Sequence, residues 1–246
     1  MKRLPAASSA WAWFLDVDGT LVDLAETPAA IDVGASLLAL IEALRQASGG
    51  AVALVSGRSL ADLDRRFHLP LLAMAGQHGL ERRDAFGHIH RHSLSPLCSD
   101  RFIKRLELLL VRQPGLRVEC KGATLAVHYR LAPRLGGYVH RLLGELAAQT
   151  PGLEVQAGKR VVEIKPAGFD KGSAIAEYMG QPPFLGRRPV FVGDDLTDEH
   201  GFSVVSRLDG VSVKVGPGRS KARYRLRDVA AVHAWIRAAL PAPEAS

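Results

Sequence analysis

The chain contains very little cysteine. Only two of its 246 residues are cysteines, Cys98 and Cys120, and they stand 22 positions apart without a CxxC pair. This spacing argues against a zinc site and against a framework of disulfides, so we expect two reduced thiols.

Long hydrophobic runs are also absent. No apolar segment approaches the roughly 20 residues that a membrane-spanning helix needs. The stretch between Arg3 and the small residues 7–10 is too short for the apolar centre of a signal peptide. No internal repeat, low-complexity tract or long linker appears, and only the two chain ends look loosely structured in composition. We therefore expect a cytoplasmic protein that does not contact membranes.

The chain lacks a dense basic block, although it is basic overall. Lys and Arg together number 32 against 25 Asp and Glu, which gives a formal net charge of +7. The basic residues are spread through the chain, so we do not expect nucleic acid as a partner. A positive field of this kind suits a small anionic substrate. With 47% hydrophobic and 23% charged residues, the composition is that of a globular protein with one large or two modest domains.

Two carboxylates follow directly on an apolar strand near the start of the chain. Residues 14–20 read Phe-Leu-Asp-Val-Asp-Gly-Thr, which places Asp16 and Asp18 where the strand predicted over 11–17 ends in a turn. A buried charge is costly unless a metal or a partner compensates it. The alternative is that Asp16 caps a helix and that Asp18 belongs to an ordinary turn.

Three further segments carry polar residues at comparable places. Residues 51–58 form an apolar run that ends in Ser56 and Arg58, where a hydroxyl and free amides suit an oxyanion. Lys171 begins a predicted helix over 171–179. Residues 190–199 are an apolar strand followed by four acids within six residues, and a merely solvated acidic face seldom follows such a strand.

The two ends of the chain alternate strands and helices, which predicts an α/β core with a doubly wound parallel sheet. We expect strands at 11–17, 51–55, 71–75, 189–193 and 211–215, and helices at 33–48, 59–67, 171–179, 197–206 and 228–240. In such a sheet ligands bind beyond the carboxyl ends of the strands, and all four polar segments lie at such ends or at a helix start.

The middle of the chain has a different pattern. We expect helices at 99–112 and 134–149 and strands at 116–120, 123–130, 153–157 and 160–165. The alternation of polar and apolar residues predicts antiparallel strands with one polar face. We therefore predict a smaller α+β domain over 94–166, inserted into a core formed by residues 1–93 and 167–246.

Taken in order, the four polar segments resemble the haloacid dehalogenase superfamily of phosphotransferases. The resemblance implies that Asp16 is the nucleophile that becomes an aspartyl phosphate and that Asp18 serves first as acid and then as base. Ser56 would hold phosphoryl oxygens, and Lys171 would neutralise charge between the phosphoryl group and Asp16.

The same resemblance implies a magnesium ion. Oxygen-only ligands next to a phosphate favour Mg²⁺. The ligands would be Asp16, the backbone carbonyl of Asp18, and Asp194. Asp195 and Asp198 would bind through water or support the ligands, and the sequence does not separate these two roles.

Further segments are similar to bacterial trehalose-6-phosphate phosphatases, over nearly the whole chain from about residue 11 to residue 235. They are residues 75–83, 121–130, 161–166 and 193–199. The resemblance alone implies trehalose 6-phosphate as substrate, and it implies that the inserted domain is a cap that closes on the sugar. The candidate sugar-binding residues are Arg58 and His78 in the core and Lys121, His128, Arg130, Lys159 and Glu163 in the cap. For each cap residue, an ordinary solvated sheet face is the alternative.

Other functions remain open from the residues. The nearest alternative is a phosphatase of the same superfamily for another sugar phosphate, and a non-catalytic binding module is the second. We interpret the alternating His88, His90 and His92 as one face of a polar hairpin and not as a metal site. We expect a monomer, and a trehalose-6-phosphate synthase is the candidate protein partner that the resemblance suggests.

Overall fold

The computed structural model describes residues 3–24, 33–91, 100–111, 113–120, 124–158 and 160–241. The chain divides into two compact units, residues 1–91 with 170–246 and residues 92–169. These boundaries lie within three residues of the ones expected from the sequence. The roles expected for the two units, phosphatase core and cap, stay predictions.

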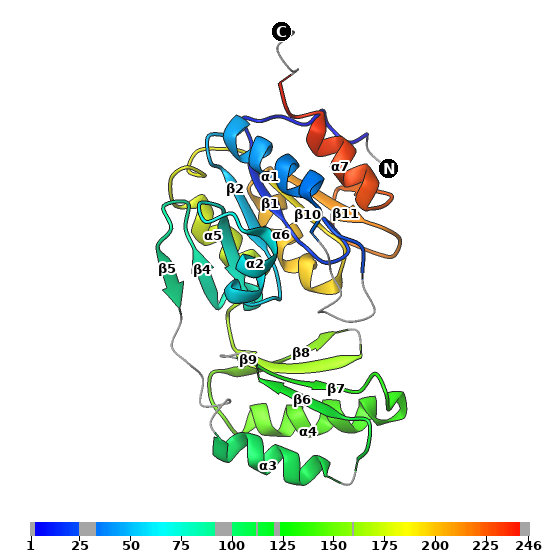
Figure 1. The fold of residues 1–246 in the computed structure, drawn as a ribbon. Helices are drawn as coiled ribbons and strands as arrows, with labels where there is room; N and C mark the ends of the chain where they lie inside the picture. Colours follow the sequence, from blue (N-terminus) through cyan, green and yellow to red (C-terminus); the bar gives the residue numbers. More distant parts are fainter. Residues whose placement is uncertain are drawn as a thin grey trace. The chain divides into compact units, whose positions relative to one another are not determined.

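The larger unit is built on an eight-stranded sheet in the order β12-β11-β10-β1-β2-β3-β4-β5 (Figure 1). The pairs from β12 through β3 are parallel, and β4 and β5 join antiparallel. The strands are β1 (Ala12–Leu15), β2 (Val52–Val55), β3 (Ala73–Gly76), β4 (Glu81–Arg83), β5 (Ile89–Arg91), β10 (Pro189–Gly193), β11 (Val211–Val215) and β12 (Tyr224–Leu226). The central strands are apolar because both sheet faces are covered.

Helices cover both faces of this sheet. One apolar cluster joins the strands to α1 (Ala35–Ala47), α2 (Leu60–Phe67) and α7 (Val229–Arg237). A second cluster joins the other face to α5 (Lys171–Met179) and α6 (Glu199–Arg207). Ser59, Asp170 and Asp228 accept backbone hydrogen bonds at the starts of α2, α5 and α7, as good N-cap residues do. The doubly wound α/β core predicted from the sequence is confirmed.

The hairpin β4–β5 extends the sheet and contains the alternating histidines. Asp84 accepts hydrogen bonds from the amides of Phe86 and His88, both 2.9 Å, and so fixes the turn. Nδ1 of His88 and Nε2 of His90 lie 3.2 and 3.1 Å from its other oxygen. The interpretation as a polar hairpin is confirmed for these two residues, and His92 lies outside the described residues.

The smaller unit is a four-stranded antiparallel sheet in the order β6-β7-β9-β8 with two helices. Its core contains leucines of the two helices and apolar residues of β7 and β9. The elements are α3 (Asp100–Leu110), β6 (Arg117–Cys120), β7 (Leu125–His128), α4 (Gly136–Ala148), β8 (Leu153–Gly158) and β9 (Val161–Pro166). The described residues also include short 3-10 segments, Pro133–Leu135 in this unit and Gln77–Gly79 and Leu196–Asp198 in the larger one. The predicted α+β architecture is correct.

The expectation of two reduced thiols is wrong. Cys120, at the end of β6, is disulfide-bonded. The chain's other cysteine, Cys98, lies outside the described residues. Sequence spacing alone does not reveal such a bond, because a disulfide requires two Cα atoms within about 7 Å, and that proximity is set by the fold.

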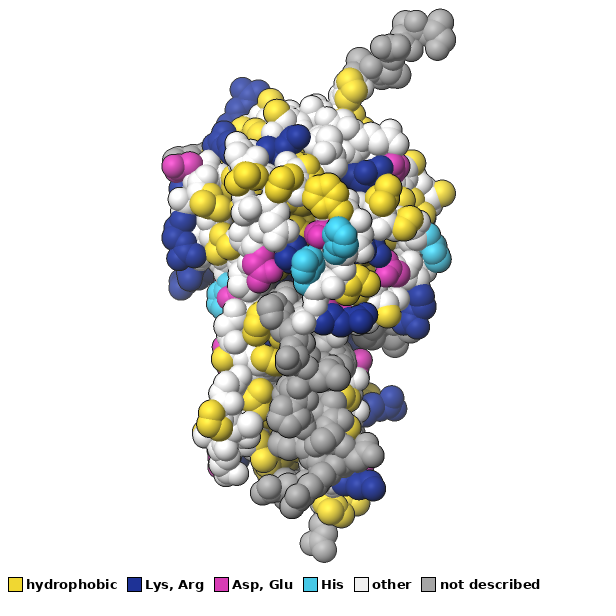
Figure 2. All heavy atoms as spheres, turned by 90° about the vertical axis from the view of Figure 1, so that its left-hand side faces the viewer, with side chains coloured by type: hydrophobic (Ala, Val, Ile, Leu, Met, Phe, Trp, Pro, Cys, Tyr) yellow, Lys and Arg dark blue, Asp and Glu magenta, His cyan; other side chains and the backbone are white. Residues whose placement is uncertain are grey.

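On the face of the protein shown in Figure 2, the Lys and Arg side chains lie in separate places and not in one continuous basic patch. Among the described residues, no helix has both the length and the apolar character to cross a membrane.

Candidate active site

Asp16 lies at the carboxyl end of β1, the strand between β10 and β2. Its amide donates to the carbonyl of Val192 at 3.0 Å, so the sheet holds its backbone. The side chain is only 5% exposed. One carboxylate oxygen accepts a hydrogen bond from the Thr20 hydroxyl at 3.2 Å, and the other accepts one from the Lys171 ammonium at 2.6 Å. A carboxylate held in this way has one orientation.

The turn after Asp16 requires glycine at position 19. Gly19 has φ +79°, in the left-handed region, and its amide donates to the carbonyl of Val22 at 2.7 Å. A Cβ atom on Gly19 would lie 2.2 Å from a carboxylate oxygen of Asp194. The glycine therefore lets the turn bend and lets Asp194 approach it.

Lys171 is the first residue of α5, and its side chain joins two carboxylates. The helix start is fixed by reciprocal hydrogen bonds between Asp170 and Ser173. The ammonium lies 2.6 Å from Asp16 and 2.7 Å from Asp198, and it is 3% exposed. Burial opposes the charge on this lysine, but the attraction of Asp16 and Asp198 outweighs it and raises the pKa of Lys171. Lys171 is therefore a permanent cation.

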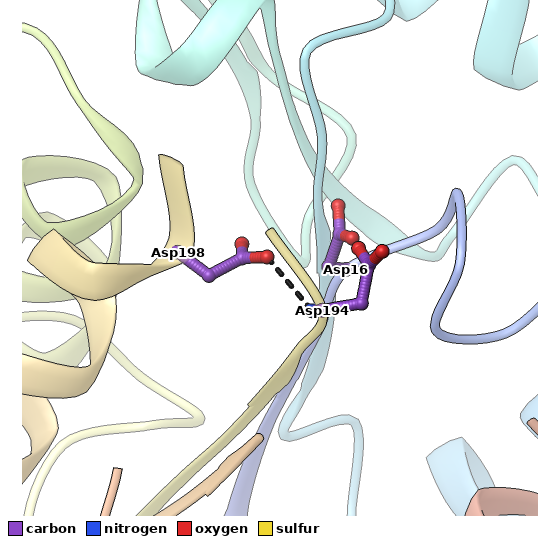
Figure 3. Close-up of side chains that lie close together, drawn as sticks. All are labelled: Asp16, Asp194 and Asp198. Carbon is purple, nitrogen blue, oxygen red and sulfur yellow. Dashed lines mark hydrogen bonds between the residues drawn. The ribbon is translucent and has the colours of Figure 1, made fainter. Parts of the chain in front are cut away.

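Asp198 orders the loop after β10. It is completely buried, and one of its oxygens accepts a hydrogen bond from the amide of Asp194 at 2.9 Å (Figure 3). The same oxygen accepts one from the amide of Asp195, also at 2.9 Å. A Cβ atom on Gly193 would lie 2.4 Å from its carboxyl carbon, so the close approach needs glycine there. Asp195 itself is exposed. Asp198 thus supports the loop, while Asp194 presents its carboxylate toward Asp16 (Figure 3).

The three carboxylates form a site suited to a cation. Oxygens of Asp16, Asp194 and Asp198 all lie within 4.8 Å of one another. Burial, followed by repulsion from Asp198, raises the pKa of Asp16 well above its ordinary value, and the same two causes raise the pKa of Asp194 to about 6. Lys171 offsets only part of this repulsion. An oxygen-only donor set with excess negative charge is what Mg²⁺ prefers, so the residues present fit that ion.

Asp18 lies two residues beyond Asp16 and pairs with Arg58. Nε and Nη2 of Arg58 donate to the two oxygens of Asp18, each at 2.7 Å. Arg58 also donates to Asp62 at 2.6 Å. The expected contact between Arg58 and the sugar stays a prediction, but the structure adds a partner that the sequence did not indicate.

Ser56 and His78 lie at the ends of β2 and β3. The Ser56 hydroxyl accepts a hydrogen bond from the Arg58 amide at 3.1 Å, and the side chain is buried. The backbone of His78 is left-handed, with φ +59°, and its amide donates to the carbonyl of Ser56 at 3.0 Å. A Cβ atom on Gly57 would lie 2.8 Å from Nε2 of His78. His78 therefore packs on the segment that contains Ser56.

The described candidate residues of the smaller unit lie in or next to β7 and β9. Nε2 of His128 lies 2.7 Å from a carboxylate oxygen of Glu119, and the His128 side chain is one-third exposed. Glu163 is buried in β9, where it pairs in register with Ala126 and Gln156. Arg130 is exposed. Lys121 and Lys159 lie outside the described residues.

Two buried residues near the carboxylates were not among the candidates. Thr20 donates to Asp16, and its signal was its place in the Asp-Gly-Thr end of the first motif. Lys214 in β11 donates to the backbone carbonyls of Asp194 and Val215. Its signal was a lysine within a strand that is otherwise three valines and a serine, which indicates a buried partner.

Comparisons with known proteins agree with this geometry. Residues 14–230 match the model of the trehalose-phosphatase family. A trehalose-6-phosphate phosphatase of Escherichia coli is 43% identical over 96% of this chain and 89% of its own. The crystal structure of a trehalose-6-phosphate phosphatase related protein is similar, with a TM-score of 0.74 and 29% identity over 92% of this chain and 95% of that one.

The fold is also found in a haloacid dehalogenase-like hydrolase from Bacteroides thetaiotaomicron. That structure has a TM-score of 0.68 and 14% identity, and the match covers 92% of this chain and 97% of the other. At this identity the likeness concerns the fold alone. The predicted haloacid dehalogenase-like fold is confirmed.

Proposed function

The chain belongs to the trehalose-phosphatase family, and we propose that it hydrolyses trehalose 6-phosphate to trehalose and phosphate, a reaction of trehalose biosynthesis. The observation that carries this proposal is the arrangement of Asp16, Lys171 and Asp194 in a chain that matches the family over most of its length. The nearest alternative is the same chemistry on another sugar phosphate.

Asp16 is the nucleophile in this proposal. It is buried, oriented from both oxygens and paired with an ammonium, so it can attack phosphorus without first losing a shell of water. A bond forms between a carboxylate oxygen of Asp16 and phosphorus, and the bond from phosphorus to the sugar oxygen breaks. The sugar oxygen leaves with the electron pair and takes a proton from the carboxyl group of Asp18 to give trehalose.

Water completes the reaction. Asp18, now a carboxylate, removes a proton from a water molecule, whose oxygen attacks phosphorus. The bond from phosphorus to Asp16 breaks, phosphate leaves, and Asp16 is restored as a carboxylate. Lys171 neutralises charge on Asp16 and on the transferring group, and Ser56 with nearby amides holds phosphoryl oxygens.

Magnesium is the proposed cofactor, held by Asp16, the carbonyl of Asp18, and Asp194. Such an ion polarises the phosphoryl oxygens and compensates their charge when it is bound. Asp198 supports this site through Lys171 and the backbone of Asp194, and the exposed Asp195 is proposed to act only through water. The raised pKa values of Asp16 and Asp194 support this assignment, because a cation would relieve the repulsion that raises them.

The smaller unit is proposed to select the sugar. Lys121, His128, Arg130, Lys159 and Glu163 are its candidate residues, with His78 and Arg58 of the larger unit. Hydroxyl groups of a disaccharide need side chains that donate and accept, and a site built in this way rejects ligands that leave its polar groups unpaired. Glu163 is buried, which is unusual for a glutamate, and this burial supports its assignment as a sugar-binding residue.

The test is release of phosphate from a panel of sugar phosphates with Mg²⁺ present. We expect kcat/KM for trehalose 6-phosphate to exceed that for glucose 6-phosphate and other hexose phosphates by at least about 10²-fold, because unpaired polar groups in the site are costly. Preference for a different sugar would establish the alternative phosphatase. Absence of turnover on every substrate would indicate the non-catalytic module.

Location and assembly complete the proposal. We propose a cytoplasmic monomer, with association to a trehalose-6-phosphate synthase as the candidate interaction. A disulfide is uncommon in the cytoplasm, where thiols are kept reduced, so the disulfide at Cys120 makes the location the part of this proposal that most needs a test. Cell fractionation combined with thiol labelling of the isolated protein tests the location, and sedimentation with and without the synthase tests the assembly.

A further inference from the structure

Arg58 forms a two-point contact with Asp18. The two residues lie 40 positions apart, and the fold brings them together because β1 and β2 are neighbours whose carboxyl ends lie at the same sheet edge. Nε to Oδ2 and Nη2 to Oδ1 both measure 2.7 Å, which is the parallel fork geometry of an arginine on a carboxylate. The Arg58 side chain is 10% exposed, whereas that of Asp18 is 29% exposed.

Asp62 holds the arginine in this direction. Its Oδ2 accepts Nη1 of Arg58 at 2.6 Å, and its amide donates to the Ser59 side chain at the start of α2. Arg65 and Arg66 also donate to Asp62, at 3.1 and 3.0 Å. One end of the guanidinium is therefore tied to the first turn of a helix, and the other end faces Asp18.

Asp18 needs such support more than Asp16 does. It lies in the turn beyond the strand, and its carboxylate is more exposed than that of Asp16, which is almost fully enclosed. An exposed aspartate can rotate toward solvent, and a small displacement of a reacting group reduces the rate strongly. The bidentate contact restricts this rotation.

We infer that Arg58, anchored by Asp62, is a positioning residue that fixes the side chain of Asp18 for proton transfer to the leaving alcohol. The fork holds the ionised form of Asp18, and one of its two contacts is released when Asp18 carries the proton that it gives to that alcohol. The inference rests on the proposed role of Asp18. It assigns to Arg58 an action through Asp18, in contrast to the contact with sugar hydroxyls that the family resemblance implies.

The two roles predict different results with two substrates. Trehalose is a poor leaving group, so its oxygen needs the proton from Asp18, whereas p-nitrophenolate departs without a proton. The parameter kcat/KM reports the steps up to formation of the phosphoenzyme, and these include departure of the leaving group. Arg58→Met should lower kcat/KM for trehalose 6-phosphate by about 10²-fold, the effect of misplacing a general acid. For p-nitrophenyl phosphate the loss should be less than about threefold. Asp62→Asn, which leaves Arg58 without its anchor, should show the same selectivity with a loss of about tenfold.

Further variants separate orientation from charge and from a merely structural role. Arg58→Lys keeps the charge but offers a single contact point, so it should restore only part of the activity on trehalose 6-phosphate. Arg65→Met is the matched control, since Arg65 contacts Asp62 but not Asp18 among the contacts described, and both activities should stay within about twofold of wild type.

A third substrate shows whether Arg58 acts through Asp18 or only through contact with the sugar. Glycerol 3-phosphate lacks the disaccharide but has an equally poor leaving group, so Arg58→Met should lower its kcat/KM as strongly as that for trehalose 6-phosphate. Loss on trehalose 6-phosphate alone would overturn the inference in favour of sugar binding. Equal loss on all three substrates, with p-nitrophenyl phosphate included, would overturn it in favour of a structural role.

Asp18→Asn shows whether the premise holds. If this variant does not lose activity selectively on the two poor leaving groups, the proposed role of Asp18 fails. If it does and Arg58→Met behaves like wild type, only the role of Arg58 fails. Thermal unfolding of each variant identifies any that do not fold. If Arg58→Met does not fold, the losses of Asp62→Asn on the same three substrates test the inference in its place.

Discussion

The two units of this protein place their functional candidates in different ways. In the larger unit, Asp16, Lys171 and Asp198 are buried, and each is held by two or more bonds from different elements. In the smaller unit, the His128 side chain is one-third exposed and Arg130 is exposed. The proposed reacting groups of the larger unit are thus fixed by contacts within that unit, whereas the described candidates of the smaller unit include side chains that face solvent.

This difference fits the two tasks that we propose for the units. Stabilising charge on a transferring phosphoryl group requires fixed dipoles and cations, because any reorganisation would cost activation energy. Recognising sugar hydroxyls requires several donors and acceptors, each contributing modestly. We therefore expect changes in the larger unit to affect every phosphate ester and changes in the smaller unit to affect only the sugar substrate.

The largest effect should follow from Asp16→Asn. The amide is nearly isosteric but cannot form the phosphoenzyme, so kcat on both trehalose 6-phosphate and p-nitrophenyl phosphate should fall by at least about 10⁴-fold. Steady-state kinetics measures the loss, and circular dichroism checks that the variant is folded. Substantial turnover in a clean preparation would remove Asp16 from its role.

Removal of divalent metal should have the next largest effect and should again affect both substrates. Without Mg²⁺ the acid cluster keeps its repulsion and the phosphoryl oxygens are uncompensated, so chelation with EDTA should reduce activity by about 10³-fold. Added Mg²⁺ should restore it, while Ca²⁺ should inhibit because its larger, looser shell displaces Asp16. Full activity after exhaustive chelation would contradict the proposed requirement for Mg²⁺.

Glu163→Ala should reduce activity on the sugar substrate without affecting the chemistry proposed for the larger unit. Loss of a buried acceptor leaves sugar hydroxyls unpaired, so kcat/KM on trehalose 6-phosphate should fall by about 10²-fold while activity on p-nitrophenyl phosphate stays nearly unchanged. Glu145→Ala, an exposed glutamate on α4 of the same unit, is the control and should alter neither. An equal loss on both substrates would mean that Glu163 supports the fold and not the specificity.

The smallest effect should follow from a change at Asp62, the residue that anchors Arg58, and it concerns the stability of the folded protein. Burial opposes ionisation of Asp62, but hydrogen bonds from Arg66, Arg58 and Arg65 prevail and lower its pKa to about 2. A carboxyl group with a lowered pKa stabilises the folded state above its unfolded pKa of about 4, and this contribution disappears as the pH falls from about 4 toward 2.

Asp62→Asn should therefore be less stable than wild type at pH 7, by on the order of 1 kcal/mol after allowance for solvent screening. The difference should shrink as the pH falls below about 4. Urea unfolding at pH 7 and at pH 3 measures it. A difference independent of pH would show that Asp62 stabilises the protein by packing and not by its charge.

Most elements could be predicted because their periodicity is strong. The apolar runs at β1, β2 and β10 and the helix that begins at Lys171 lie within a few residues of the expected bounds. Of the three-residue strands, β12 was not predicted, and β4 and β5 were expected only as a polar hairpin without bounds. The strand β4 (Glu-Arg-Arg) has no apolar residue, β5 (Ile-His-Arg) has one, and β12 (Tyr-Arg-Leu) is too short to show an alternation, so none shows the pattern of a buried strand.

The candidate site was predictable to a similar degree. Asp16, Lys171 and Asp194 stand at strand or helix ends with a clear motif, and the structure brings them together. The fork between Arg58 and Asp18 had no local signal, and the strand that contains Lys214 indicated a buried partner without identifying it, because each contact joins residues of neighbouring strands.

The sequence by itself determined the fold class and the residue types that the proposed phosphoryl transfer needs, since these depend on local periodicity and on short motifs. Only the tertiary structure decided which partner each charge has. A buried or half-buried charge is stabilised by groups a few ångströms away, and these come from elements distant in the chain. The same reason explains the disulfide at Cys120, because proximity between two cysteines is a property of the folded chain and not of their spacing.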